Sequence, residues 1–355
     1  MQSKLDPCLF IGPKVICIVY VDDVLFWSPK EEYIYEVGQN LRDQGVELEE
    51  EGDAAGFLGV DLSRDPETGQ IHLTQAGLIK RIVDALGLDS TVVNPRVTPA
   101  ERKPLVKDED GEPPQESYNY ASIVGMLLYL AGHTRPDIAY SVSQVARFMF
   151  CPKRSHEQAL KMIGRYLIGT MDRGMILTPS GQLDIDAYPD ADFAGLYGYE
   201  DVQDPVCVRS RTGYIIMVAN CPILWKSSLQ TETATSTMEA EIIALSNCCR
   251  ELFPIMELVK AIASAIDMRQ ENSPRMHVTI HEDNSGALIL ANTLPPQFTP
   301  RSKHYAIKTI WFREKIVEYG IDVVAIDTKL QRGDIFTKMP PAAVFEFLRK
   351  LIQGW

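Results

Sequence analysis

Residues 183–192, LDIDAYPDAD, open the part of the chain whose pattern decides the fold. Apolar and acidic residues alternate in its first half, which predicts a strand, and the strand ends on Asp190 and Asp192. Three consecutive strands and then alternating helices and strands are predicted, which favours an α/β fold: a mixed five-stranded sheet with flanking helices. The further strands are expected at 212–219, 223–227, 277–281 and 321–327, and the helices at 236–258, 285–291, 303–319 and 342–351.

The residues before this stretch follow other patterns. Two β-prone runs within residues 15–28 flank Asp22-Asp23 and predict a hairpin with a two-residue acidic turn. Residues 95–117 are rich in Pro, Asp and Glu, which predicts a linker or an exposed loop. Helices are expected at 31–45, from a Thr74 cap to Leu86, and at 118–132, 138–150 and 155–169, and short strands at 56–62 and 70–73. We therefore expect three parts: residues 1–75, a helical part at 76–180 with the linker near 95–117, and the α/β domain at 181–355.

Composition bounds the class of protein. A chain of 355 residues with 45% hydrophobic and 23% charged residues is ordinary for a globular protein of two or more domains. No apolar run is long enough to cross a bilayer, and residues 1–6 lack the apolar core of a signal peptide. We therefore expect an intracellular, cytoplasmic protein with no membrane partner. Seven irregularly spaced cysteines without a C-x-x-C pair argue against a zinc site or a disulfide framework.

Charge is distributed unevenly along the chain. The formal net charge of −13 argues mildly against a general nucleic-acid binder. A local basic face can nevertheless hold phosphates on an acidic protein, although a solvated helix face explains the same residues equally well. The candidate nucleic-acid-binding residues are Arg147, Lys153, Arg154, Lys161 and Arg165.

Acidic residues lie where an α/β sheet places its functional groups, at strand ends and helix starts. Taken singly, each is better explained as a surface or capping acid, so the prediction rests on the set. Carboxylates converging from four elements would offer hard oxygen ligands, which suit Mg²⁺ or Mn²⁺ better than zinc. Two such ions about 4 Å apart can activate a water and stabilise the leaving oxygen of a phosphodiester. The candidate catalytic and metal-binding residues are Asp190, Glu241, Asp283 and Asp334.

Two positions in this set each have a neighbouring acid as an alternative ligand. Ser236 to Glu239 has the S-x-x-E capping-box pattern, so Glu239 is expected to accept a hydrogen bond from the backbone amide of Ser236. Glu241 lies on an apolar helical stripe, where an acid is costly to bury unless it is paired or metal-bound. This favours Glu241 as the functional acid. Asp190 and Asp192 project to the same face of their strand, and the choice between them stays open.

Several segments resemble, in order, the ribonuclease H domain of copia-type LTR-retrotransposon Pol polyproteins. Residues 188–195 (YPDADFAG) resemble its D-A-D-[WF]-A-G motif. Residues 210–214 resemble S-T-S-G-Y, 225–227 resemble W-K-S-K, 236–246 resemble S-S-T-E-A-E-Y-I-A-L-S, 282–287 resemble C-D-N-Q-S-A, 301–304 resemble R-T-K-H and 333–338 resemble A-D-I-L-T-K. The resemblance implies a ribonuclease H-like sheet and metal-dependent endonucleolytic hydrolysis of RNA in an RNA–DNA hybrid. It implies Asp190, Glu241, Asp283 and Asp334 as metal ligands, with Asp192 and Glu239 as the alternates; we assign no catalytic role to His304.

The first half of the chain resembles the end of the reverse transcriptase in the same polyproteins. Residues 20–23 (YVDD) resemble the catalytic turn of its palm, and residues 57–59, 73–75, 124–130 and 134–137 follow as in that family. The resemblance implies that Asp22 and Asp23 are polymerase carboxylates, that 76–180 is a thumb or connection region, and that the upstream Pol region is a partner. A complete palm has a third carboxylate on an earlier strand, and only 19 residues precede Tyr20. We therefore expect a partial palm without polymerase activity of its own, located in a virus-like particle if the element is active.

Two other functions remain open. The first is a degenerate or co-opted fragment that folds but does not catalyse a reaction. Such a fragment would act, if at all, as a binding protein. An integrase-like enzyme would rely on fewer carboxylates and would leave Asp334 unexplained, so it fits the sequence less well.

Overall fold

The computed structural model describes residues 1–50, 52, 54–88, 92–115, 118–265, 276–293 and 306–355. The chain forms two compact units. Met1–Leu58 and Arg250–Arg275 make up the first, and Gly59–Cys249 and Met276–Trp355 the second. The predicted division at residues 75 and 180 stays a prediction.

The first unit contains an antiparallel sheet with the order β1-β2-β3. Its elements are β1 (Leu9–Ile11), β2 (Ile16–Tyr20), β3 (Asp23–Trp27), α1 (Glu31–Asp43) and β4 (Gly56–Phe57). The predicted hairpin is present, with one difference in its turn. Tyr20 pairs with Asp23, so the two turn residues are Val21 and Asp22, and Asp23 is the first residue of β3. Val21 has a φ of 56°, a backbone conformation that a β-branched residue rarely adopts.

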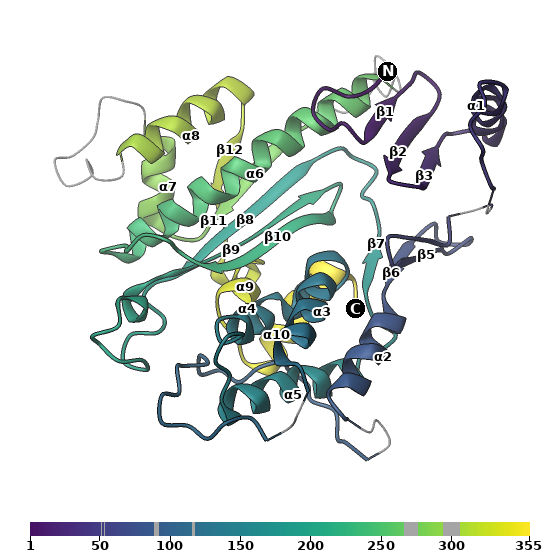
Figure 1. Cartoon of the computed structure of the whole chain (residues 1–355). Coiled ribbons are helices and arrows are strands. Elements are labelled where there is room, and N and C mark those ends of the chain that lie inside the picture. Colours follow the sequence, from purple (N-terminus) through teal and green to yellow (C-terminus); the bar gives the residue numbers. More distant parts are fainter. Residues whose placement is uncertain (51, 53, 89–91, 116–117, 266–275, 294–305) are drawn as a thin grey trace. The chain divides into compact units, whose positions relative to one another are not determined.

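The second unit is built on the mixed five-stranded sheet that the sequence predicts (Figure 1). The strand order is β10-β9-β8-β11-β12. The first three strands in the chain pair antiparallel, whereas β11 is parallel to both β8 and β12. The strands are β8 (Ile185–Asp192), β9 (Arg211–Val218), β10 (Cys221–Leu229), β11 (Val278–Glu282) and β12 (Asp322–Ala325).

Helices line both sides of this sheet in Figure 1, with α6 and α7 on one side and α9 and α10 on the other. The alternation of side chains explains this arrangement, because neighbouring residues of a strand face opposite ways. Tyr188 of β8 packs with α9 and α10 residues in the main core, while Ala191 packs against Ala240 and Ile243 of α6. The helices are α6 (Thr237–Ala265), which belongs to the first unit from Arg250 on, α7 (Ser285–Asn292), α8 (Ala306–Tyr319), α9 (Asp334–Thr337) and α10 (Ala342–Gln353), with short 3-10 turns at Pro205–Val208 and Thr328–Leu330.

The helical segment before the sheet shares its core. Buried side chains of α2 to α5 form one continuous cluster with Tyr188, Ile215 and Met217 of the sheet. The elements of this segment are β5 (Val60–Arg64), β6 (Ile71–Thr74), α2 (Ala76–Ala85), α3 (Tyr120–His133), a 3-10 turn (Pro136–Ile138), α4 (Ala139–Ala146), α5 (Arg154–Ile168) and β7 (Met175–Leu177). The sequence did not predict β7, which pairs with β6.

The predicted helix cap at Thr74 is wrong. Thr74 is the last residue of β6 and pairs with Asp61, so α2 begins one residue later with Gln75 at the N-cap position. The Gln75 side chain bonds to the fold instead: it donates to the Gly59 carbonyl and accepts from the Thr134 hydroxyl.

The predicted loop near residues 95–117 contains neither helix nor strand in its described part, but it is attached to α5. The Ser155 hydroxyl donates to Asp108 at 2.6 Å, and the amide of Arg154 donates to the Glu112 carbonyl at 2.9 Å. Residues at the start of α5 therefore fix a segment that has no regular structure of its own. Among the helices that the structure describes, none is long and apolar enough to cross a membrane.

Candidate metal centre

Two of the predicted carboxylates meet because their strands are parallel neighbours. β8 and β11 pair with Ile185 opposite Val278 and Ala187 opposite Ile280. Continuing this register places Asp283, just after β11, level with Asp190 near the end of β8. Parallel strands present their carboxyl ends at one edge of the sheet, so the fold itself brings these acids together from positions far apart in the sequence.

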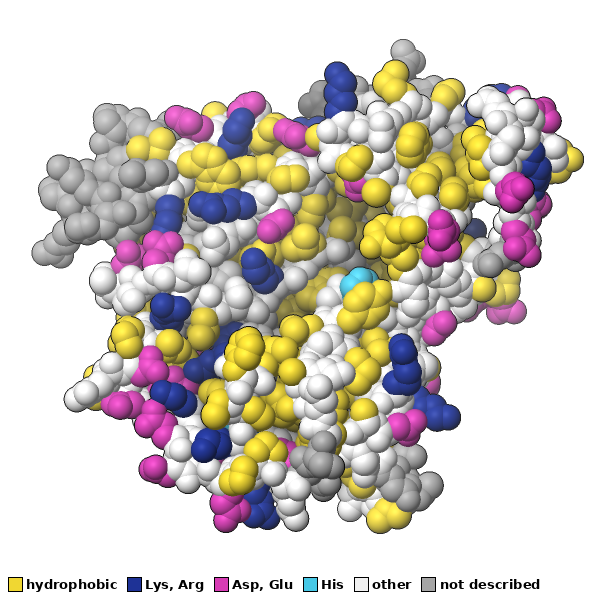
Figure 2. Space-filling model, in the orientation of Figure 1, with side chains coloured by type: hydrophobic (Ala, Val, Ile, Leu, Met, Phe, Trp, Pro, Cys, Tyr) yellow, Lys and Arg dark blue, Asp and Glu magenta, His cyan; other side chains and the backbone are white. Residues whose placement is uncertain are grey.

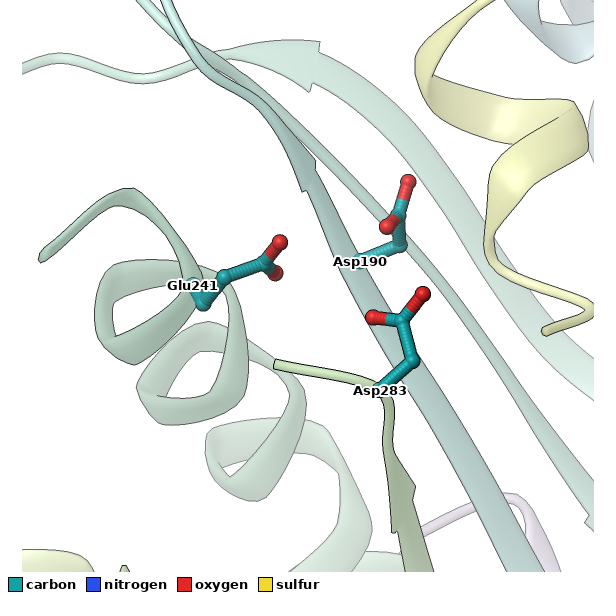
Figure 3. Close-up of side chains that lie close together, drawn as sticks. All are labelled: Asp190, Glu241 and Asp283. Carbon is teal, nitrogen blue, oxygen red and sulfur yellow. The ribbon is translucent and has the colours of Figure 1, made fainter. Parts of the chain in front are cut away.

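The third carboxylate comes from the start of α6. The Ser236 hydroxyl accepts the Glu239 amide at 3.1 Å, as the capping pattern predicts. The Glu239 carboxylate accepts from the amide and hydroxyl of Thr235, both at 2.7 Å, rather than from the amide of Ser236. Glu239 thus caps the helix, and Glu241 is the glutamate that faces Asp190 and Asp283 (Figure 3).

The side chains of Asp190, Glu241 and Asp283 point toward one another, and ligand atoms from all three lie within 4.8 Å of each other. We call them the three-carboxylate cluster. Burial raises the pKa of Asp190 to about 7, and the neighbouring Asp334 and Asp283 add to the shift. Burial, with the charges of Asp190, Glu282 and Asp283, raises the pKa of Glu241 to about 11. Three ionised carboxylates at this spacing require protons or cations to compensate their charge.

The cluster has the chemistry of a site for a hard divalent cation. Glu241 Oε2 is buried and has no hydrogen-bond partner among the described residues, although an unpaired buried acceptor is costly. All the converging donors are carboxylate oxygens, which suit Mg²⁺ or Mn²⁺. The residues present therefore fit a divalent ion, and among the described residues this is the one group of three such side chains close enough to share one.

Asp334 lies near Asp190 and Asp283 but outside the group of three. Its Oδ1 pairs with Lys338 Nζ at 2.6 Å, and its charge adds to the rise in the pKa of Asp190. Asp192 is also outside the group. A Cβ on Gly195 would clash with the Asp192 carboxylate, so that carboxylate lies against the turn after β8. The geometry thus separates Asp190 from Asp192, which the sequence did not.

Three residues around the cluster were not predicted from the sequence. Thr337 donates its hydroxyl hydrogen bond to Asp190 Oδ2, and Lys338 pairs with Asp334. Both follow Asp334 within one helical turn, and that spacing could have indicated them. Glu282 is buried, and burial raises its pKa to about 8. Strand alternation was the available signal, because Val278 and Ile280 are the other buried residues of β11.

The predicted polymerase carboxylates have different surroundings. Asp22 and Asp23 are both exposed on the hairpin of the first unit. Among the residues that the structure describes, no third metal-ligating side chain joins them in a group that could hold an ion. His304, with the rest of residues 301–304, lies outside the described residues.

Each of the five predicted nucleic-acid-binding cations has an acceptor within the chain. Arg147 pairs with Glu200 at 2.5 Å, Arg154 with Glu112 at 2.6 Å and Lys161 with Glu157 at 3.4 Å. Lys153 and Arg165 donate to the carbonyls of Gly111 and Asn94. Figure 2 shows acidic and basic side chains interspersed over the lower part of the view, where Figure 1 places α5. Lys153 and Arg154 attach the loop to the start of α5, and a role of the five cations in binding phosphates stays a prediction.

No family model matches the chain. The chain is 32% identical over 98% of its length to the retrovirus-related Pol polyprotein from transposon RE1 of Arabidopsis thaliana, of which it covers 22%. It is 28% identical over 99% of its length to the corresponding polyprotein from transposon TNT 1-94 of Nicotiana tabacum, of which it covers 26%. A foamy viral protease-reverse transcriptase in complex with dsDNA aligns with a TM-score of 0.41 at 13% identity, over 88% of this chain and 55% of that one. The chain thus spans about a quarter of its curated relatives, and similarity over nearly its whole length shows that it belongs to the Pol polyproteins of copia-type retrotransposons.

Proposed function

We propose that the second unit is a ribonuclease H-like domain that cuts the RNA strand of RNA–DNA hybrids with the help of divalent ions. The observation that carries this proposal is the convergence of Asp190, Glu241 and Asp283, whose ligand atoms lie within 4.8 Å of one another. The substrate class comes from the resemblance to retrotransposon Pol, and membership in that family supports it. Membership in the same family is also the basis for expecting the protein to act inside the cell, in the cytoplasm or in a virus-like particle.

The bound ions would activate the attacking water and stabilise the leaving oxygen of the phosphodiester. The RNA product would then end in a 3′-hydroxyl. The protein's own part is to hold the carboxylates in place. Asp190 comes from a central strand, Asp283 from the end of the neighbouring parallel strand, and Glu241 from the first turns of α6. The hydroxyl of Thr337 donates to Asp190 and so fixes the orientation of its carboxylate, as hydrogen bonds from neighbouring groups do at metal sites.

Close packing around Asp190 keeps its strand, β8, in position. A Cβ on Gly333 would lie 2.7 Å from the Asp190 Cβ, and a Cβ on Gly213 would lie 2.7 Å from Thr337 Cγ2. Only glycine fits at these two positions without moving the strand or α9. The precise placement that two-metal chemistry needs therefore has a packing basis in these contacts.

A binding protein without catalysis is the second candidate, and one observation favours it. All five cations predicted to contact the hybrid already have acceptors within the chain, which weakens the expected attraction for phosphates. The carboxylates favour the enzyme, because a protein that only binds the hybrid does not require two buried acids and a half-buried one placed together at the cost of their desolvation.

Cleavage of a labelled RNA–DNA hybrid during a Mg²⁺ titration separates the two candidates. We expect cuts in the RNA strand that require Mg²⁺ or Mn²⁺, with little cleavage of single-stranded RNA or duplex DNA. A folded chain that binds the hybrid and leaves it intact at every metal concentration would support the binding protein instead.

We also propose that the reverse transcriptase part is inactive in this chain. Asp22 and Asp23 supply two carboxylates, and two-metal nucleotide addition needs a third ligand. Primer extension with the isolated chain should give no product above background. Robust incorporation of nucleotides would refute this.

A further inference from the structure

Lys338 occupies an unusual place beside the three-carboxylate cluster. It follows directly after α9, and its Nζ lies 2.6 Å from Asp334 Oδ1. The Asp334 side chain is only 10% exposed, whereas that of Lys338 is 47% exposed. A half-exposed ammonium thus forms an ion pair with a largely buried carboxylate.

Asp190 connects Lys338 to the cluster. Asp190 faces Glu241 and Asp283, and the charge of the nearby Asp334 adds to the rise in the pKa of Asp190. Burial by itself would lower the pKa of Lys338, but the charges of Asp190, Asp334 and Asp192 outweigh burial and raise the pKa above its ordinary value. The ammonium therefore pairs directly with Asp334, and its charge also acts on Asp190 and Glu241. Among the ion pairs of the described residues, none joins a cation directly to Glu241 or Asp283.

We propose that Lys338 is a built-in counter-ion at the second cation position, so that the two divalent ions bind one after the other and not together. This rests on the proposed function, because it takes the four carboxylates as metal ligands. The first ion enters the three-carboxylate cluster. A second ion on Asp334 would lie within a few ångströms of the ammonium, and like charges repel strongly at that distance. Lys338 must leave Asp334 before this ion binds.

The lysine side chain is suited to such a displacement. Its flexible four-carbon stem carries a compact, strongly hydrated charge, and nearly half of it is already exposed. It can move into solvent without disturbing the core. An arginine would keep the charge, whereas a glutamine would remove it and retain much of the length.

Calorimetric titration of Mn²⁺ into the metal-free full chain tests this proposal. We expect wild type to bind one ion, and a second at least tenfold more weakly. Lys338→Gln should strengthen binding of the second ion roughly 10–100-fold, as expected for loss of a competing charged contact, and leave the first within about twofold. Lys338→Arg should behave as wild type, and Asp334→Asn should lose the second ion. Thermal melting checks that each variant is folded.

The outcomes separate this inference from the proposed function. If Lys338→Gln and wild type bind the second ion equally, or if neither binds it, the counter-ion role is refuted even when the hybrid is cleaved. If wild type binds no ion at all, the proposed metal centre itself is refuted. Binding of both ions to wild type with equal affinity also overturns the sequential order.

Discussion

Two acidic groups of this chain, each predicted to hold metal ions, differ most in their burial. Asp190 and Glu241 are 3% and 7% exposed in the three-carboxylate cluster, whereas Asp22 and Asp23 are exposed on a hairpin. A buried carboxylate is costly unless something compensates its charge, but an exposed one is compensated by water. Burial therefore distinguishes a group that needs a cation from one that is stable without it.

The most informative test of this difference is removal of one charge from each group. Asp283→Asn takes one charge and little volume from the cluster, so we expect hybrid cleavage to fall at least about 10²-fold with the fold intact. The matched control, Asp23→Asn in the hairpin, should cleave as wild type does. Rates with labelled hybrid and circular dichroism of each variant provide the measurement, and normal cleavage by Asp283→Asn would show that the site assignment is wrong.

The stability of the metal-free protein should depend on pH through the cluster. The folded pKa of Glu241 lies far above its ordinary value of 4.5, so the folded chain holds a proton that the unfolded chain releases. This contribution is fully present below about pH 4.5 and is lost as pH rises toward the folded pKa. In the presence of a chelator, Glu241→Gln should therefore become progressively more stable than wild type between pH 5 and 9.

Melting temperatures of the two proteins across this range give the readout. Addition of Mg²⁺ at high pH should stabilise wild type. The difference in melting temperature between Glu241→Gln and wild type should then become smaller or change sign. Parallel curves for wild type and Glu241→Gln would mean that the burial of this carboxylate carries no electrostatic cost.

Glu239 provides a second control, since it lies two residues from Glu241 on the same helix. It accepts hydrogen bonds from Thr235 and caps α6. We expect Glu239→Gln to lower the free energy of unfolding by about 1 kcal/mol and to retain cleavage. Chemical denaturation and hybrid cleavage measure the two effects, and a loss of cleavage as large as that of Glu241→Gln would contradict the separation of their roles.

The smallest expected effect lies in the hairpin. Val21 has a φ of 56°, and this conformation costs a residue with a Cβ about 1–2 kcal/mol, part of which the greater unfolded-state freedom of glycine offsets. Val21→Gly should therefore stabilise the first unit by roughly 0.5–1 kcal/mol and leave hybrid cleavage unchanged. Hydrogen exchange of the β2–β3 hairpin amides provides the measurement, and faster exchange in the variant would be the opposite of what we expect.

Patterns within single elements were predictable from the sequence. The alternation that ends at Asp190, the long helix containing Glu241 and the order of strands and helices all gave the mixed sheet that the structure contains. The S-x-x-E pattern separated Glu239 from Glu241, because capping is a local interaction.

Features that depend on contacts between distant segments were not predictable in the same way. The choice between Asp190 and Asp192 is made by α9 and the turn at Gly195. The pairing of β7 with β6, about a hundred residues apart, left no local signal. Arg154 and Ser155 of α5 bond to Glu112 and Asp108 of a preceding loop, and the sequence shows these residues without showing that they meet.

The most direct test of the central claim is a crystal structure of the protein with Mn²⁺, with the ion located by anomalous scattering. We predict a peak bound by oxygens of Asp190, Glu241 and Asp283 at about 2.1 Å, the distance expected for a small hard cation. Well-ordered carboxylates at these positions with no anomalous peak between them, at a Mn²⁺ concentration that supports hybrid cleavage, would contradict the claim.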